Sequence, residues 1–231
     1  MQASSAPIDG QPQQKAAAAR RHPGAPSLYQ LFWIFVIASI LGYVVEMLFY
    51  FVRHGSFESR QGLLYGPFSQ IYGLGAAALS AILGRFERCH NLVIFGVSAV
   101  FGAVFEFVCS LVQELVFGSV SWDYTGSPLN LGGRTNIKYA IFWGLLGLVF
   151  LRAIYPWFCD LIRHIPTRWA VPLTSVVAIF LAVDMVLSAA AVWRSGQRRQ
   201  GVAPEGGFAV FLDQTYPDDY LKEVYPNMKF I

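Results

Sequence analysis

Residues 92–117 have the sequence LVIFGVSAVFGAVFEFVCSLVQELVF, which is apolar at most positions. About 20 consecutive apolar residues are enough for a helix to cross the roughly 30 Å hydrocarbon core of a bilayer, so this stretch predicts a transmembrane helix. It nevertheless contains two carboxylates, Glu106 and Glu114. The same stretch therefore indicates both the class of the protein and where a polar site would lie.

Composition supports a membrane protein. Of the 231 residues, 55% are hydrophobic and only 13% are charged, which is too apolar for a soluble domain. The net charge of +3 gives no reason to expect a nucleic acid, because the basic residues lie between apolar runs, where they flank a bilayer. The bilayer is thus the expected partner. The cysteines and histidines lack metal or redox spacing, so we expect no metal site and no cofactor.

Five apolar runs are each long enough to span a membrane. They are 28–52, 63–83, 92–117, 137–155 and 169–193. Helices are the expected form, because backbone groups in lipid must satisfy their own hydrogen bonds. The predicted fold is an all-α, polytopic membrane protein with five transmembrane helices in 28–193. Its second helix is expected to be interrupted near Gly66-Pro67, since proline suits a first helical turn.

The two ends of the chain differ from this domain. Residues 1–27 are rich in Ala, Gln, Pro and Ser and predict a disordered N-terminal tail, and residues 194–231 predict a polar and aromatic C-terminal tail. Lys and Arg are divided almost evenly between the two sides of the predicted spans. The first span usually has the largest influence on the orientation of the whole protein in the membrane. We therefore expect a multi-pass protein of the cell membrane with its N-terminus in the cytoplasm.

Four acidic residues lie within the predicted spans. An ionisable group there costs a few kcal/mol on insertion scales and normally faces the bundle interior or a water-filled cavity. Counting about 1.5 Å of rise per residue, we expect Glu46, Glu106 and Asp184 in the half of the membrane away from the N-terminus. Glu114 is expected at or near the interface on that side. Glu106 is therefore the first choice for a functional carboxylate.

Polar backbone features are predicted in the same half. Non-helical backbone at Gly66-Pro67 is tolerated at membrane depth only if it is buried in protein or lines a wet cavity, and the loop 121–138 ends on the same side. The sequence therefore predicts one polar chamber with no assigned catalytic residue. The residues expected to bind substrate there are Glu46, Arg60, Tyr65, Glu106, Glu114, Trp122, Asp123, Asn130, Arg134 and Asp184. The alternative is structural, with each acid tied to an arginine or a tyrosine to fix helix register.

Several motifs occur in order along the chain. They are GYVVE (42–46), RQGLLYGPFSQIYGLG (60–75), FEF (105–107) followed by Glu114, WDYTGSPLNLGGR (122–134) and WGLLG (143–147). Together they resemble the putative ABC-transporter type IV family, also called CmpB-like, from about Phe32 to Ser188. The resemblance implies a permease-like membrane protein, with no agreed substrate. The chain lacks the Walker A motif GxxxxGK[ST], so any ATP-binding subunit would be a separate chain.

Three functions stay open at this point. The favoured one is a permease-like protein whose acidic chamber binds a cation or a polar, positively charged solute. The second is an intramembrane enzyme acting on a lipid or lipid-linked substrate, with two carboxyls as general acid and base. The third is a non-catalytic membrane scaffold, in which the acids fix helix register. An enzymatic activity is less expected than transport.

Overall fold

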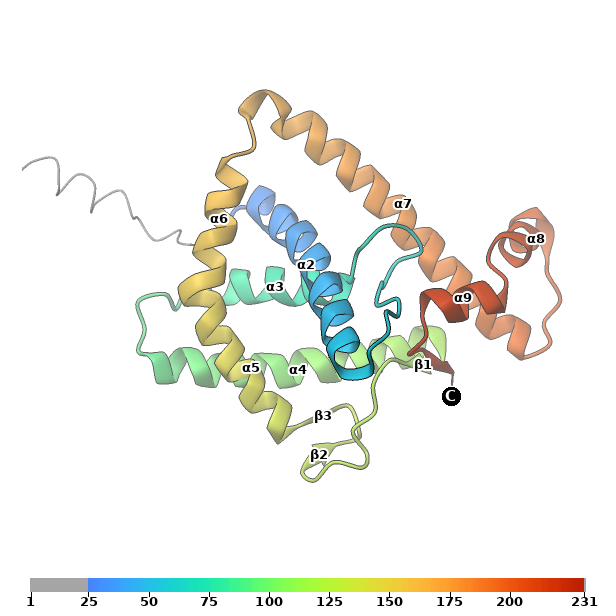
Figure 1. Cartoon of the computed structure of the whole chain (residues 1–231), viewed down its shortest axis with the longest axis horizontal. Helices are drawn as coiled ribbons and strands as arrows, with labels where there is room; N and C mark the ends of the chain where they lie inside the picture. The colour runs from blue at the N-terminus through green and yellow to red at the C-terminus, as the bar shows by residue number, and fades with distance from the viewer. Residues whose placement is uncertain (1–24, 231) are drawn as a thin grey trace, which may run out of the picture.

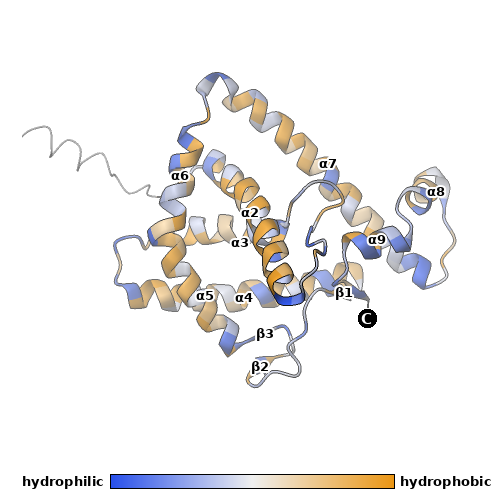
Figure 2. Cartoon of the chain, viewed as in Figure 1, coloured by the Kyte–Doolittle hydropathy of each residue, from blue (hydrophilic) through white to orange (hydrophobic). Residues whose placement is uncertain are grey.

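Four long apolar helices dominate the computed structural model, which describes residues 25–230 (Figure 1). Three are α2 (Leu28–His54), α4 (Asn91–Phe117) and α7 (Thr167–Arg199). The fourth runs from α5 (Ile137–Val149) through the π-helical turn η1 (Phe150–Ile154) into α6 (Tyr155–Arg163). Figure 2 shows the apolar residues along these helices. The predicted all-α membrane fold is thus confirmed, while residues 1–24 of the predicted tail lie outside the described residues.

The second apolar run is not one full-length helix, so the predicted count of five spans is not exact. Its helix α3 (Gln70–Leu83) has 14 residues, or about 21 Å at 1.5 Å per residue, less than the hydrocarbon core. The helix also begins three residues after Pro67. Gly66 has a φ of +77°, and the Gly62 N–H donates to the Phe68 carbonyl at 2.7 Å. This looped backbone delays the start of the helix. We call residues 61–69 the broken segment.

Glycines bring the helices together in two pairs, α2 with α3 and α4 with α5. A Cβ on Gly73 of α3 would lie 2.1 Å from the Ser39 Oγ of α2, and a Cβ on Gly102 of α4 would lie 1.9 Å from the Trp143 Cγ of α5. Small residues permit such close packing, which replaces the hydrophobic effect as the driving force inside a bilayer. Gly73 therefore admits α2 as a close neighbour of α3.

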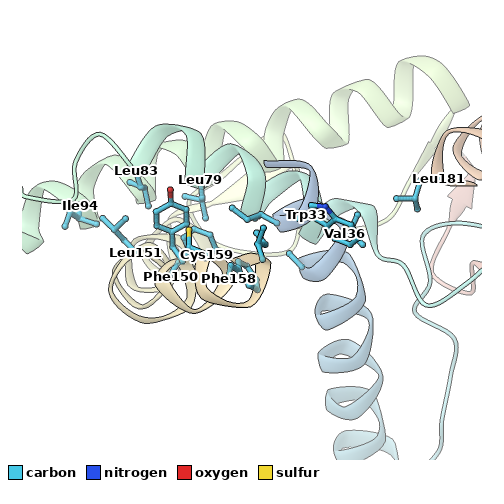
Figure 3. Close-up of a cluster of buried hydrophobic side chains, with 14 of the residues drawn as sticks. Trp33, Val36, Leu79, Leu83, Ile94, Phe150, Leu151, Phe158, Cys159 and Leu181 are labelled. Carbon is cyan, nitrogen blue, oxygen red and sulfur yellow. The ribbon is translucent and has the colours of Figure 1, made fainter. Parts of the chain in front are cut away.

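A buried apolar cluster joins the pairs at the end of the bundle where α2 begins (Figure 3). Its members come from all the membrane helices. Those labelled in the figure are Trp33, Val36, Leu79, Leu83, Ile94, Phe150, Leu151, Phe158, Cys159 and Leu181. The Trp33 indole also donates to the Thr174 Oγ1 of α7 at 3.0 Å. The cluster thus packs the membrane helices against one another.

The C-terminal residues fold against that other end. They form α8 (Gly206–Thr215), α9 (Asp218–Val224) and β4 (Lys229–Phe230), which pairs antiparallel with β1 (Ser119–Val120) after α4. A second short pair, β2 (Asn130–Leu131) and β3 (Thr135–Asn136), folds the following loop back towards α5. A second apolar cluster ties the broken segment to α7, α8 and α9. Its buried members are Leu64, Ala191, Leu212, Tyr216, Leu221 and Val224.

The glycine packing predicts that Gly102→Ala and Gly96→Ala, both in α4, have opposite effects. A Cβ at Gly96 meets no atom within 4 Å, so alanine there should stabilise the helix by about 0.5–1 kcal/mol. A Cβ at Gly102 overlaps the Trp143 ring, and overpacking typically costs about 1–3 kcal/mol. Thermal unfolding in detergent should show a lower Tm for Gly102→Ala alone. Equal Tm values for the two variants would contradict this packing.

Candidate functional site

Glu106 lies in the second half of α4 and is half-buried. The Thr135 hydroxyl donates to its Oε2 at 2.9 Å, and the Tyr124 hydroxyl and the Trp143 indole face the same carboxyl. Thr135 and Tyr124 belong to the loop after α4, which the β2–β3 pair turns back towards the helix. All these partners are uncharged donors. Among residues 25–230, no ion pair holds the Glu106 carboxyl.

Glu46 on α2 has a similar environment. The Tyr72 hydroxyl of α3 donates to its Oε1 at 2.9 Å. Gly42, one helical turn before Glu46, makes room for this tyrosine, because a Cβ there would lie 2.4 Å from the Tyr72 Cγ. The close packing of α2 on α3 therefore places the neutral Tyr72 hydroxyl next to the Glu46 carboxyl.

The tyrosines that face these two carboxyls lie near each other. Tyr124, which faces Glu106, also lies within electrostatic range of Tyr72, the partner of Glu46. The group draws on α2, α3, α4 and the following loop, which are far apart in the sequence. We call it the paired-carboxyl cluster; its members are Glu46, Tyr72, Glu106, Tyr124 and Thr135.

Asp184 on α7 belongs to a different group. Its carboxyl is only 1% exposed and accepts hydrogen bonds from the Tyr65 N–H at 3.2 Å and the Ser188 hydroxyl at 3.3 Å. The Leu64 N–H donates to the same Ser188 oxygen at 2.9 Å, and the Tyr65 hydroxyl contacts the Tyr216 hydroxyl at 2.8 Å. Within the described chain, no hydrogen bond or ion pair joins Asp184 to either glutamate of the paired-carboxyl cluster.

Glu114 and Arg134 form an ion pair near the end of α4. Arg134 also donates to the Ser110 Oγ at 3.2 Å, and the Trp122 indole donates to the Arg134 carbonyl at 3.0 Å. These contacts fix the loop after α4 onto that helix. Glu114 thus differs from Glu106, whose hydrogen-bond partners are neutral, in having a guanidinium as its partner.

The three remaining predicted residues make local contacts. Arg60 pairs with Glu58 at 3.0 Å. Asp123 accepts hydrogen bonds from the Thr125 N–H at 2.9 Å and its hydroxyl at 3.1 Å, and Asn130 bonds to the backbone of its own loop. These contacts shape the loops at the polar end of the bundle.

An ion cluster at the end of α7 was not among the predicted site residues. Arg194, which is 3% exposed, donates to both oxygens of Asp213 at 2.9 Å. Arg198 pairs with Asp213 at 2.7 Å and Asp218 at 2.5 Å, and Ser195 donates to Asp218 at 2.7 Å. The arginines were interpreted as membrane flanks. Their spacing of one helical turn, followed by two aspartates in the tail, is the pattern that could have indicated this cluster.

A family model described as Putative ABC-transporter type IV matches residues 33–189 of the chain. The chain belongs to this family. The match contains every predicted site residue and ends before the ion cluster of Arg194 and Arg198. Together with the four long apolar helices, it makes the chain a multi-pass membrane protein of a transporter-type family. No curated protein and no solved structure matches the chain.

The ion cluster predicts a specific acid sensitivity of the C-terminal segment. The hydrogen bond from Arg194 is the main cause that lowers the pKa of Asp213 from 3.8 to about 2. Because the folded-state pKa is depressed, the stabilisation is complete above the unfolded-state pKa of about 4 and is lost as the pH falls towards 2. Limited proteolysis between pH 5 and pH 2.5 should release the C-terminal segment as the pH falls.

Asp213→Asn should weaken that pH dependence, of which Asp218 keeps a part through Arg198, and loosen the segment already at neutral pH. Asp219→Asn is the matched control, because Asp219 is exposed on the same segment and should leave the acid transition unchanged. An unaltered transition in Asp213→Asn would contradict the role of this ion cluster.

Proposed function

We propose that the protein is a permease-like membrane subunit and that the paired-carboxyl cluster binds a cation or a positively charged polar solute. The observation that carries this proposal is the environment of Glu106. Its carboxyl lies within an apolar span, and the groups that face it are the neutral donors Thr135, Tyr124 and Trp143. An ionised carboxylate with neutral partners in such surroundings is costly unless a cation joins it.

The charges around Glu46 support the same ligand class. Its hydrogen-bond donor, Tyr72, is neutral. Arg60 lies within electrostatic range of Glu46, but its guanidinium pairs with Glu58 and covers the Tyr50 ring at 4.3 Å. The negative charge of the two glutamates is therefore not balanced by an arginine of this cluster. A cationic ligand would balance it.

The exposure of the cluster is compatible with exchange of a ligand. Tyr72 is 41% exposed, and Glu46 and Glu106 are half-buried. The loop that supplies Tyr124 and Thr135 follows α4 directly and covers one side of Glu106. Since the chain has no Walker A motif, we propose that any ATP hydrolysis in such a system takes place on a separate partner subunit.

This proposal predicts that Glu106→Gln weakens the binding of a cationic solute. Loss of a charge-assisted interaction costs about 1.5–3 kcal/mol, which corresponds to roughly 10- to 150-fold in Kd. The measurement is the shift in Tm of the purified full chain in detergent on titration with choline, spermidine or Mg²⁺. Glu46→Gln should weaken the same response.

Glu205→Gln is the control, because Glu205 is exposed between α7 and α8 and should keep the wild-type response. If both glutamine variants of the cluster respond to these cations as the wild type does, the proposed site is wrong. If they unfold at lower temperature and the wild type responds to none of the three cations, the carboxyls fix helix register instead.

A further inference from the structure

Unpaired buried polar atoms gather around the broken segment. In the described chain, five buried side-chain atoms have no hydrogen-bond partner. They are Ser39 Oγ, Arg60 Nε, Gln70 Oε1, Asp184 Oδ2 and Tyr225 Oη. Such atoms are rare in folded proteins, and each calls for an explanation such as a bound ion or water.

Four of the five residues border the broken segment directly, and the fifth lies near the residues that precede it. Arg60 and Gln70 are its immediate neighbours in the sequence. Ser39 accepts the Ser69 N–H through its carbonyl at 3.0 Å, and Asp184 accepts the Tyr65 N–H. The last, Tyr225, follows Val224, whose carbonyl accepts a hydrogen bond from Ser59. Four of the five atoms are oxygens, each of which can accept a hydrogen bond or act as a ligand to a cation.

Asp184 provides the charge for such a ligand. One carboxyl oxygen, Oδ1, accepts hydrogen bonds from the Tyr65 N–H and Ser188. The other, Oδ2, is buried and has no hydrogen-bond partner within 3.5 Å, although the Leu64 N–H also faces the carboxyl. Among residues 25–230, no lysine, arginine or histidine lies within 4.0 Å of this carboxylate in an ion pair. A residue that is only 1% exposed thus points an unsatisfied oxygen into the protein.

Neutral hydroxyls surround the same carboxyl. Ser188 contacts it directly, and the Tyr225 phenol lies next to Ser188 and within electrostatic range of Asp184. Burial raises the pKa of the Tyr225 hydroxyl well above its usual range, so the phenol keeps its proton and offers a neutral oxygen. Tyr216 and Tyr220 also lie within electrostatic range. The group therefore carries one negative charge among neutral oxygens.

We infer that Asp184, Ser188 and Tyr225 form a binding site for a monovalent alkali cation, separate from the paired-carboxyl cluster. One carboxylate balances one positive charge, whereas a divalent ion would leave a net positive charge buried. Oxygen ligands suit hard cations. The broken segment lies beside the site, and unwound backbone of this kind supplies carbonyl ligands to monovalent cations in membrane proteins.

The proposed cation would join three parts of the chain. Asp184 and Ser188 belong to α7, Leu64 and Tyr65 to the broken segment, and Tyr225 follows α9. Binding should therefore stabilise the docking of both the broken segment and the C-terminal residues on α7. This coupling does not depend on the solute that the paired-carboxyl cluster is proposed to bind.

The test is the Tm of the full chain in detergent as Na⁺ or K⁺ replaces N-methylglucamine at constant ionic strength. We expect the Tm of the wild type to rise with alkali cation concentration by several degrees. Binding of ²²Na⁺ should approach one ion per chain. Glu106→Gln should keep this response, and Asp184→Asn should lose it while keeping the response to choline, spermidine or Mg²⁺, so the two proposals fail independently.

Tyr225→Phe is a second test variant, which keeps the inference testable if Asp184→Asn does not fold. Because the Tyr225 hydroxyl faces Ser188 but makes no hydrogen bond within 3.5 Å, its removal should change the Tm without alkali cations little. In the presence of Na⁺ it should shift the midpoint of the titration about tenfold upward, as expected for one lost ligand worth about 1.4 kcal/mol. Tyr29→Phe is the control. Tyr29 lies in the first turn of α2, away from the proposed cation site, so this variant should match the wild type.

Three results would overturn the inference. The first is a wild-type Tm that depends on neither Na⁺ nor K⁺. The second is an undiminished response in Asp184→Asn together with Tyr225→Phe. The third is a response to pH alone, which would mean that a proton, and not an alkali cation, neutralises Asp184.

Discussion

The hydrogen bonds from the Leu64 and Tyr65 amides to Ser188 and Asp184 hold the broken segment against α7. Backbone N–H groups that leave a helix at membrane depth must find partners in the protein, because lipid offers none. Two short polar side chains, one helical turn apart on α7, provide these partners. The start of α3 depends on this anchoring, and so does the contact of Tyr65 with Tyr216 in the C-terminal segment.

The buried acids differ in what surrounds them. Glu46 and Glu106 are half-buried and meet neutral hydroxyls from α3 and the loop after α4. Asp184 is fully buried. Its Oδ1 accepts a hydrogen bond from the Tyr65 N–H, whereas its Oδ2 has no hydrogen-bond partner. Glu114 has an arginine as its partner. These three environments suit three roles, namely the proposed binding of a solute, the proposed binding of an alkali cation, and the attachment of a loop.

Much of the fold could be predicted because hydropathy depends on the local sequence alone. The run 92–117 corresponds to α4 (Asn91–Phe117) within one residue at its start. The run 137–155 was too short, since the helix continues to Arg163 through residues such as Asp160 that are not apolar. The late start of α3 was not predictable in this way, because the partners of Leu64 and Tyr65 lie 124 and 119 residues further along the chain.

The candidate site was predictable in part for a similar reason. Acids within apolar runs are visible in the sequence, as is Arg134 as a nearby cation. The assignment of each acid to its partners requires the helix pairing, which depends on close contacts such as that of Gly42 with Tyr72. The ion cluster of Arg194 and Asp213 was missed because arginines after an apolar run also suit a membrane interface.

The broken segment buries Leu63, Leu64 and Ser69 and is held against α7 by its Leu64 and Tyr65 amides. Hydrogen–deuterium exchange of the full chain in lipid nanodiscs, followed by mass spectrometry of peptides covering residues 61–69, tests this attachment most directly. The Leu64 and Tyr65 amides, which are hydrogen-bonded to α7, should exchange as slowly as those of α3. Exchange as fast as that of the exposed linker 202–205 would contradict it.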